Sequence, residues 1–432
     1  MGLLAVALAL EVGAALVVER MQATTAPAAS AVRGRVAPPI DLDAARGAAV
    51  RALLDARATA LQRRDRTAWL RTVDPSATAF RARQAAVFDN LAGVPISDWA
   101  YQLDPESEPP PSVDLDASRG PGWWAPGVTL TYRLAGYDDA ATVEPERLTF
   151  VPRGGRWYVA ADDDFSAAGR DSTRGLWDGG PVVVVRGLRC LVLGHPGSRE
   201  VMRRVADGLD AAVPRVSRVW GTDWTQRIIA LVPSSQRELT RVVGGHGDYS
   251  QIAAVATAEL TDANAGYHPV GNRIVINPPN FAKLGSLGRR VVLTHEVTHV
   301  ATRAASGLAA PTWLVEGFAD YVGYSGVDVP YSLSASELRD AVRRGKAPTT
   351  LPTDADFDGS NPHLAEVYEQ AWLAVTYLAS TYGRDGLLRF YRSVGRADAP
   401  PAAVDQALAS MWGTDVAGIT AGWRADMTAR LR

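Results

Sequence analysis

The chain has 432 residues, of which 47% are hydrophobic and 21% are charged. Chains of this length commonly hold two or three domains, and this composition excludes the weakly hydrophobic, highly charged class that stays disordered. With 45 basic and 47 acidic side chains the net charge is −2, so no charge excess favours binding to nucleic acid or an anionic membrane.

The first segment is typical of an exported protein. Residues 3–18 are apolar apart from Glu11, and an alanine-, threonine- and proline-rich stretch follows. The run is shorter than the about 20 residues of a membrane-spanning helix, and no basic residues precede it as in a signal peptide. We expect residues 1–39 to be a signal or anchor segment with a linker, so that the protein is extracellular or membrane-anchored. A short buried helix in a cytoplasmic protein is the alternative.

Residues 40–170 predict an accessory α+β domain. Apolar residues recur at helical spacing from 42 to about 71, and a second helical stretch covers 80–91. Segments with strand character follow at 99–103, 128–134, 147–151 and 156–160. Helices followed by a curved antiparallel sheet resemble the cone-shaped fold of the nuclear-transport-factor-like superfamily. Such a fold does not by itself assign a function.

A second domain is predicted for residues 180–432. A stretch rich in glycine, aspartate and serine at 167–180 marks the boundary. A strand–helix–strand sequence and a further strand pair come next, and from about residue 287 the pattern is helical. The chain as a whole therefore predicts the α+β class, with a mixed sheet and a helical C-terminal part in the second domain.

The single cysteine and four of the six histidines show no metal-site spacing. Cys190 lies in the apolar run LRCLVLG, which predicts a buried strand residue and excludes an intramolecular disulfide. The four histidines lie in stretches rich in glycine, proline and asparagine, where loop packing or exposure is expected: His195, His246, His268 and His363.

The pentapeptide from His295 to His299, HEVTH, carries the strongest chemical signal. Histidines at i and i+4 stand on one helix face, so both imidazoles can bind one zinc ion. Glu296 lies about 100° around the helix from His295, where its carboxylate reaches a metal-bound water as general base. A chance HExxH is the alternative, expected in about a few chains per thousand.

Catalytic zinc usually takes three protein ligands and leaves one position for water. Glu316, in PTWLVEGFADYVGY, follows on a second predicted helix that Thr312 caps. Asp320 lies one turn beyond Glu316 on the same face, where its carboxylate can accept the free N–H of a ligating histidine. HExxH followed by WLxEGxAxY resembles the gluzincin metallopeptidases, in particular their aminopeptidase-like and peptidase MA-like branch.

The resemblance implies one zinc ion per chain, held by His295, His299 and Glu316. It further implies that Glu296 is the general base and that Asp320 is the acid behind the ligands.

The resemblance also implies a tyrosine that faces the zinc and stabilises the oxyanion of the transition state. Tyr368 matches it, on a helix predicted to be capped by Asn361 and to end at Gly383. The lysine and glycine usual two and three positions after this tyrosine are absent. Packing against Trp372, one turn on, is the alternative role for Tyr368.

In gluzincins an edge strand before the zinc helix pairs with the extended peptide substrate. Residues 251–257 and 273–277 are the two candidates for this strand. The exopeptidase branch carries a GxMEN-like motif whose glutamate binds the substrate amino terminus. That motif is absent, and Glu259 in TAELTD is only a loose counterpart, so endo- or exopeptidase preference stays open.

The sequence therefore predicts zinc-dependent hydrolysis of peptide bonds, with a peptide or protein as substrate. Two alternatives remain. The same residues could hydrolyse another acyl or epoxide substrate, or the chain could be a non-catalytic exported binding protein that retains a peptidase fold as scaffold.

Overall fold

The computed structural model describes six stretches of the chain, residues 42–105, 115–244, 249–261, 268–306, 310–396 and 402–432. The predicted signal or anchor segment, residues 1–39, lies outside the described residues, as does His246. No helix in the described stretches combines the length and the apolar character needed to cross a bilayer.

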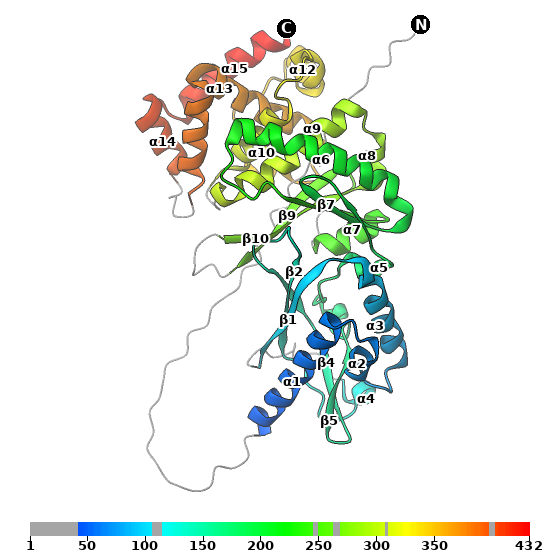
Figure 1. Cartoon of the computed structure of the whole chain (residues 1–432). Coiled ribbons are helices and arrows are strands. Elements are labelled where there is room, and N and C mark those ends of the chain that lie inside the picture. Colours follow the sequence, from blue (N-terminus) through cyan, green and yellow to red (C-terminus); the bar gives the residue numbers. More distant parts are fainter. Residues whose placement is uncertain (1–41, 106–114, 245–248, 262–267, 307–309, 397–401) are drawn as a thin grey trace, which may run out of the picture. The chain divides into compact units, whose positions relative to one another are not determined.

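The described chain divides into two compact units (Figure 1). Among the described residues, the N-terminal unit includes residues 42–135 and 141–181, and the C-terminal unit includes residues 136–140 and those from 182 onward. Each unit has a hydrophobic core of its own.

The N-terminal unit combines helices with antiparallel strands. Its three longer helices are α1 (Leu42–Gln62), α2 (Arg66–Arg71) and α3 (Thr78–Asn90). Its strands are β1 (Ile96–Asp104), β2 (Gly127–Leu134), β3 (Thr142–Glu146), β4 (Thr149–Arg153) and β5 (Arg156–Ala161). Strands β1, β2 and β3 form one antiparallel sheet, and β4 and β5 form a separate antiparallel pair.

Two predictions for this unit were wrong in detail. The helix predicted over 42–71 is two helices, because Arg64 adopts a left-handed φ of 55° and the Asp65 carboxylate caps α2 by accepting from the Ala68 N–H at 2.8 Å. The sheet also contains a strand that was not predicted, β3, whose alternation is interrupted by Pro145. That strand pairs with β2 from Thr142 to Glu146.

The C-terminal unit begins with a mixed five-stranded sheet in the order β6-β7-β8-β10-β9. The strands are β6 (Val183–Arg186), β7 (Cys190–Gly194), β8 (Ile228–Val232), β9 (Ala254–Thr261) and β10 (His268–Ile276). Strands β7, β8 and β10 run parallel, whereas β6 and β9 pair antiparallel at the two edges. Cys190 is fully buried in β7, as predicted.

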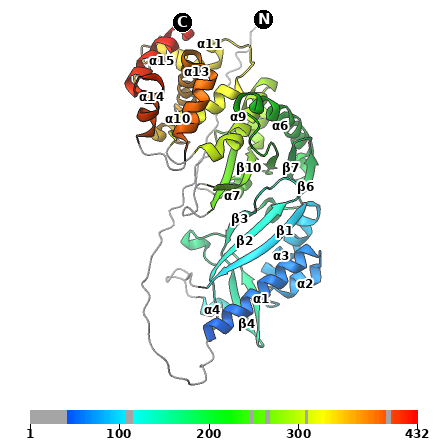
Figure 2. The ribbon, with the colours of Figure 1, turned by 60° about the vertical axis from the view of Figure 1, so that its left-hand side comes forward.

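Helices cover both faces of this sheet. Strand residues alternate between faces, so Ala254 and Ile274 pack under α6 (Arg199–Trp220) and α9 (Ser286–Thr302), whereas Val255 and Val275 pack against α7 (Gln236–Val243). Both ribbon views show α6 and α9 on one side of the sheet and α7 on the other (Figures 1 and 2). The zinc-motif helix α9 thus lies over the sheet.

The rest of the unit is helical. It contains α8 (Pro278–Lys283), α10 (Thr312–Gly323), α11 (Tyr331–Ser334), α12 (Ser336–Arg343), α13 (Leu364–Val394), α14 (Ala403–Trp412) and α15 (Val416–Leu431). Helix α13 breaks at Gly383, whose φ of 76° suits glycine, and a second helical stretch follows directly. Its start differs from the prediction, because Asn361 accepts from the His363 N–H and closes a turn before the helix.

Candidate metal centre

Helix α9 carries its polar motif into the protein interior. From Val291 to Thr302 every residue is buried, including His295, Glu296 and His299. The threonines of this stretch do not need outside partners, because Thr294, Thr298 and Thr302 each donate a hydroxyl hydrogen bond to the carbonyl four residues earlier. The buried histidines and the glutamate of this stretch therefore remain as side chains that can bind a further group, such as a metal ion.

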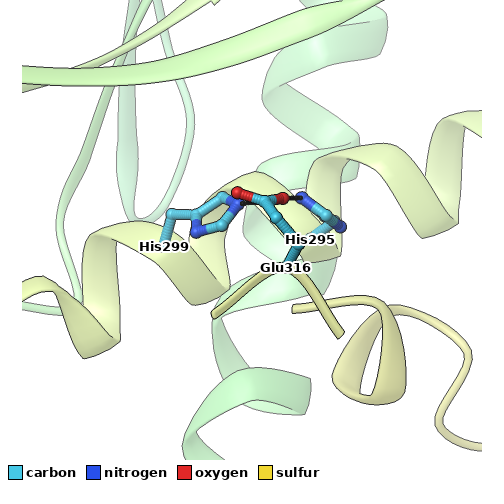
Figure 3. A group of neighbouring side chains, drawn as sticks. All are labelled: His295, His299 and Glu316. Atoms are coloured by element: carbon cyan, nitrogen blue, oxygen red, sulfur yellow. Dashed lines mark hydrogen bonds and ion pairs between the residues drawn. The ribbon is translucent and has the colours of Figure 1, made fainter. Parts of the chain in front are cut away.

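Three side chains converge on one point beside α9. The Nε2 atoms of His295 and His299 lie 2.8 Å apart, and Glu316 Oε2 lies 3.2 and 3.3 Å from them. Figure 3 shows the Glu316 carboxylate between the two imidazole rings. A tetrahedral zinc ion with bonds of about 2.0–2.1 Å separates its ligand atoms by about 3.3 Å. The cluster therefore fits zinc in both its donor types and its spacing.

Helix α10 supplies Glu316 and, one turn later, Asp320. Pro311 stands at the cap position of α10 instead of the predicted Thr312, whose N–H donates to Asp354 Oδ1 at 2.9 Å. Asp320 Oδ1 lies 2.7 Å from His295 Nδ1. An acceptor there holds the proton on Nδ1 and leaves the Nε2 lone pair directed at the cluster.

Glu296 is buried beside the cluster, with an exposed fraction of 1%. Among the described residues neither of its carboxylate oxygens has a hydrogen-bond partner. Buried polar atoms are nearly always paired, so both oxygens have capacity for a water or substrate group. Burial raises the pKa of Glu296, against the lowering influence of His295 and His299.

The pKa of Glu316, the candidate carboxylate ligand, is shifted in the opposite direction. Burial acts to raise the pKa of Glu316, but His299 and His295 outweigh it and lower the pKa to about 2. Glu316 is therefore held as a carboxylate, which is the form that binds a metal ion.

Tyr368 lies close to the cluster, buried on α13. Its ring centroid is 6.5 Å from that of His295, and its ring meets Phe357 edge-on at 5.2 Å. Trp372 stacks on Tyr324 at 4.2 Å. A small hollow beside Asp320 is lined by Asp320, Tyr324, Ser334, Ala365, Tyr368, Glu369 and Trp372.

The two candidate substrate strands have different positions in the sheet. Residues 273–276 belong to β10, which has β8 on one side and β9 on the other and so has no open edge. Residues 254–257 belong to β9, an edge strand that packs against α9. Of the two candidates, only the strand at residues 254–257 can accept an added strand.

Arg303 is a neighbour of the site that the motif did not predict. Its guanidinium donates from Nη2 to the carbonyl oxygen of Ala256 in β9 at 2.7 Å. The signal in the sequence was its spacing, because His295, His299 and Arg303 follow one another at intervals of four residues.

The other histidines are not part of the cluster. His195 Nε2 lies 2.9 Å from Glu238 Oε1, His268 begins β10, and His363 is exposed before α13. Within the described stretches, His295, His299 and Glu316 are the group whose ligand atoms, all within 4.8 Å of one another, could hold a metal ion.

Comparisons with known proteins agree with the motif. Residues 265–429 match the family described as the Peptidase MA superfamily. An M1 zinc metallopeptidase from Deinococcus radiodurans, crystallised as a variant with a Tyr-Ser-Ala substrate, is 14% identical, with a TM-score of 0.31 over 58% of this chain and 53% of its own. A two-domain M1 zinc metallopeptidase bound to L-arginine is 13% identical, with a TM-score of 0.31 over 64% and 58%. No curated protein matches the chain.

The chain thus spans little more than half the length of those two structures. The family match contains the whole HExxH motif, Glu316 and Asp320. The predicted resemblance to peptidase MA-like metallopeptidases is confirmed for residues 265–429, which match the Peptidase MA superfamily.

Proposed function

We propose that the protein is a zinc-dependent peptidase whose ligands are His295, His299 and Glu316, with one zinc ion per chain. The observation that carries this proposal is the convergence of the three ligand atoms within 4.8 Å in a buried site. A zinc ion there supplies a Lewis acid and an acidified water for attack on a carbonyl. The remaining chemistry belongs to the side chains around it.

Glu296 acts as the general base in this proposal. Its buried carboxylate has a raised pKa, so it accepts a proton from the attacking water more readily than an exposed glutamate does. The same group then carries the proton to the leaving amine. Asp320 holds the His295 ring in place through Nδ1.

Tyr368 supplies a hydroxyl to the oxyanion that forms when the peptide carbonyl is attacked. Its burial beside His295 supports this role. The peptide lies along the open edge of β9, where backbone hydrogen bonds align it with the cluster.

The first test is zinc stoichiometry by elemental analysis of the purified protein beside the Glu316→Ala variant. We expect one zinc per chain in the parent and a marked loss in the variant. Absence of zinc from the parent protein after reconstitution would overturn the proposal and favour the scaffold interpretation.

The second test is a peptide-library screen with Glu296→Gln as the inactive variant. We expect Glu296→Gln to retain zinc and to lose about 10²- to 10⁴-fold in kcat, the range that general bases contribute. Glu200→Gln, an exposed change in α6, is the matched control and should leave cleavage unchanged. Zinc binding without cleavage of any peptide would favour another acyl or epoxide substrate.

We also propose that the protein is exported or anchored in a membrane through residues 1–39. The apolar run at 3–18 supports this location. Cell fractionation with N-terminal sequencing tests it, and an intact Met1 in a soluble cytosolic fraction would contradict it.

A further inference from the structure

A short turn beside Tyr368 is held in shape by its own side chains. It contains the 3-10 helix η6 (Asp354–Phe357). The carboxylate of Asp356 accepts hydrogen bonds from the N–H and the hydroxyl of Thr353, each at 2.7 Å, and the side-chain amide of Asn361 donates to the Asp356 carbonyl at 2.6 Å. Local bonds of this kind fix a turn, so η6 has a defined shape where it contacts α10 and α13.

One end of η6 is bonded to the helix that carries Glu316. Asp354 Oδ1 accepts from the N–H of Thr312, the first residue of α10, at 2.9 Å. The first N–H groups of a helix have no partner within it and lie at the positive end of the helix dipole, so a carboxylate is a favourable partner there. The start of η6 and the start of α10 are therefore fixed to each other.

The other end of η6 packs against Tyr368. The ring of Phe357, which is 8% exposed, meets the Tyr368 ring edge-on at 5.2 Å with an interplanar angle of 88°. The Tyr368 ring also lies 6.5 Å from the ring of the candidate ligand His295. The ring of Trp372 stacks on Tyr324. Phe357 therefore supplies an aromatic edge to the tyrosine that lies beside the metal cluster.

We propose that Phe357 is a positioning residue that holds the Tyr368 hydroxyl where the oxyanion forms. This inference rests on the proposed peptidase function and on the role of Tyr368 within it. An oxyanion donor works over a narrow range of distance, about 2.7–3.1 Å, and a change of rotamer about the Cα–Cβ bond moves a tyrosine hydroxyl well outside this range. An edge-on ring contact favours one orientation over the others. Phe357 thus acts through Tyr368, and Asp354 acts through Phe357 because it ties η6 to α10.

The test replaces Phe357 with leucine, which keeps an apolar side chain but removes the ring edge. We expect Phe357→Leu to lower kcat by about 3- to 10-fold, the equivalent of one edge-on ring contact. KM should change by less than about 2-fold, because the lost interaction is made only in the transition state. Zinc content should stay the same, and Phe357→Tyr, which keeps the ring edge, should restore kcat.

The matched control is Phe390→Leu. Phe390 is fully buried in the same unit and meets Trp412 at 5.0 Å, in the part of α13 beyond the break at Gly383. Phe390→Leu should lower the free energy of unfolding, as Phe357→Leu does, but should leave kcat unchanged. A loss of kcat in both variants in proportion to their lost stability would overturn the assignment.

A Tyr368→Phe background separates positioning from packing, because it keeps the ring and removes the hydroxyl. Since Phe357 acts by placing that hydroxyl, Phe357→Leu should have no further effect on kcat once the hydroxyl is gone. An equal loss of kcat in the parent and in Tyr368→Phe would contradict the positioning role. Asp354→Ala should show the same dependence on the hydroxyl, and Asp354→Asn, which keeps an acceptor oxygen, should restore kcat.

Binding of a transition-state analogue gives a readout that needs no turnover. A phosphonamidate version of the library peptide that is cleaved best carries charged oxygens where the oxyanion forms. We expect Phe357→Leu to weaken its Kd, measured by calorimetry, by the same factor as kcat. The Kd of the uncleaved peptide, measured in Glu296→Gln with and without Phe357→Leu, should stay the same, because only the transition state uses the Tyr368 hydroxyl.

The outcomes distinguish this inference from the function on which it rests. Equal weakening of the analogue and of the uncleaved peptide would show that Phe357 shapes the substrate site as a whole, and would overturn the positioning role alone. A parent enzyme that cleaves no peptide would overturn the proposed function and this inference with it.

Discussion

Asp320 sets the orientation of His295 through a contact of 2.7 Å with Nδ1. Replacing it with asparagine keeps the size of the side chain but removes the charge that holds the Nδ1 proton. We expect Asp320→Asn to weaken zinc binding by about 10- to 100-fold, the usual cost of losing such a partner. Competition with a chromophoric chelator measures the change, and unaltered affinity would show that Asp320 does not tune the ligand.

The residues of the metal cluster could be predicted because their spacing is local. His295 and His299 lie one turn apart on α9, so helical periodicity brings them together. Glu316 lies on α10 and was predicted from the motif it shares with the gluzincins, whereas the packing of α10 on α9 brings it to them. The contact of Arg303 with Ala256 joins residues 47 positions apart and depends on the register of β9 with β10. A single sequence does not contain that register, so this contact appears only in the structure.

The glycine of the WLxEGxAxY motif, Gly317, lies where α10 packs closely against α13. A Cβ atom at Gly317 in α10 would clash with the carbonyl oxygen of Ala371 in α13. The two backbones are therefore so close that only the hydrogen atom of a glycine fits between them. We expect Gly317→Ala to lower the free energy of unfolding by about 1–3 kcal/mol, as overpacking does. It should also weaken zinc binding, because Glu316 is the preceding residue.

Denaturant titrations with zinc measurements check both effects. The control is Gly47→Ala in α1, where an added Cβ meets nothing within 4 Å. That change should raise stability by about 0.5–1 kcal/mol, because alanine is favoured over glycine inside a helix. An equal change in the free energy of unfolding for Gly317→Ala and Gly47→Ala would contradict the packing explanation.

Glu369 joins α13 to the start of α12. Its Oε2 accepts from the Leu338 N–H at 2.7 Å, and burial together with a hydrogen bond to Glu337 raises the pKa of Glu369 to about 10. The folded protein therefore keeps a proton that the unfolded chain loses above its ordinary glutamate pKa. This contribution to stability is complete at acidic pH and declines as pH rises toward about 10.

Glutamine mimics the protonated form of Glu369. We expect Glu369→Gln to stabilise the protein by at least about 1 kcal/mol at pH 8 and to flatten the decline between pH 6 and 9. Chemical denaturation at several pH values provides the measurement. A variant that is less stable than the parent at pH 8 would show that Glu369 is ionised in the folded state.

Most elements could be predicted from periodicity, and the errors have local causes. Strand β2, for example, has the alternating pattern that one face of a core imposes. The break between α1 and α2 depends on a left-handed Arg64, a conformation that the apolar spacing does not reveal. Strand β3 has a proline within it and is held by its partner β2, so tertiary pairing decides its structure.

Because the two units have separate hydrophobic cores, we expect metal binding to stabilise the C-terminal unit and not the N-terminal unit. The cluster lies entirely in the C-terminal unit, and a ligand stabilises the part of the chain that folds to bind it. We expect zinc removal to increase amide hydrogen exchange in α9 and α10 and to leave α1 and β2 unchanged. Exchange mass spectrometry with and without chelator shows this, and a uniform increase would contradict it.

The buried position of Cys190 also makes the protein convenient for spectroscopy. It is the single cysteine of the chain, it has no exposed surface, and burial raises the pKa of its thiol to about 12. At neutral pH alkylating dyes and spin labels require a thiolate, so the native chain stays unlabelled. One cysteine placed on the surface would then carry one probe, with no background to remove by mutation.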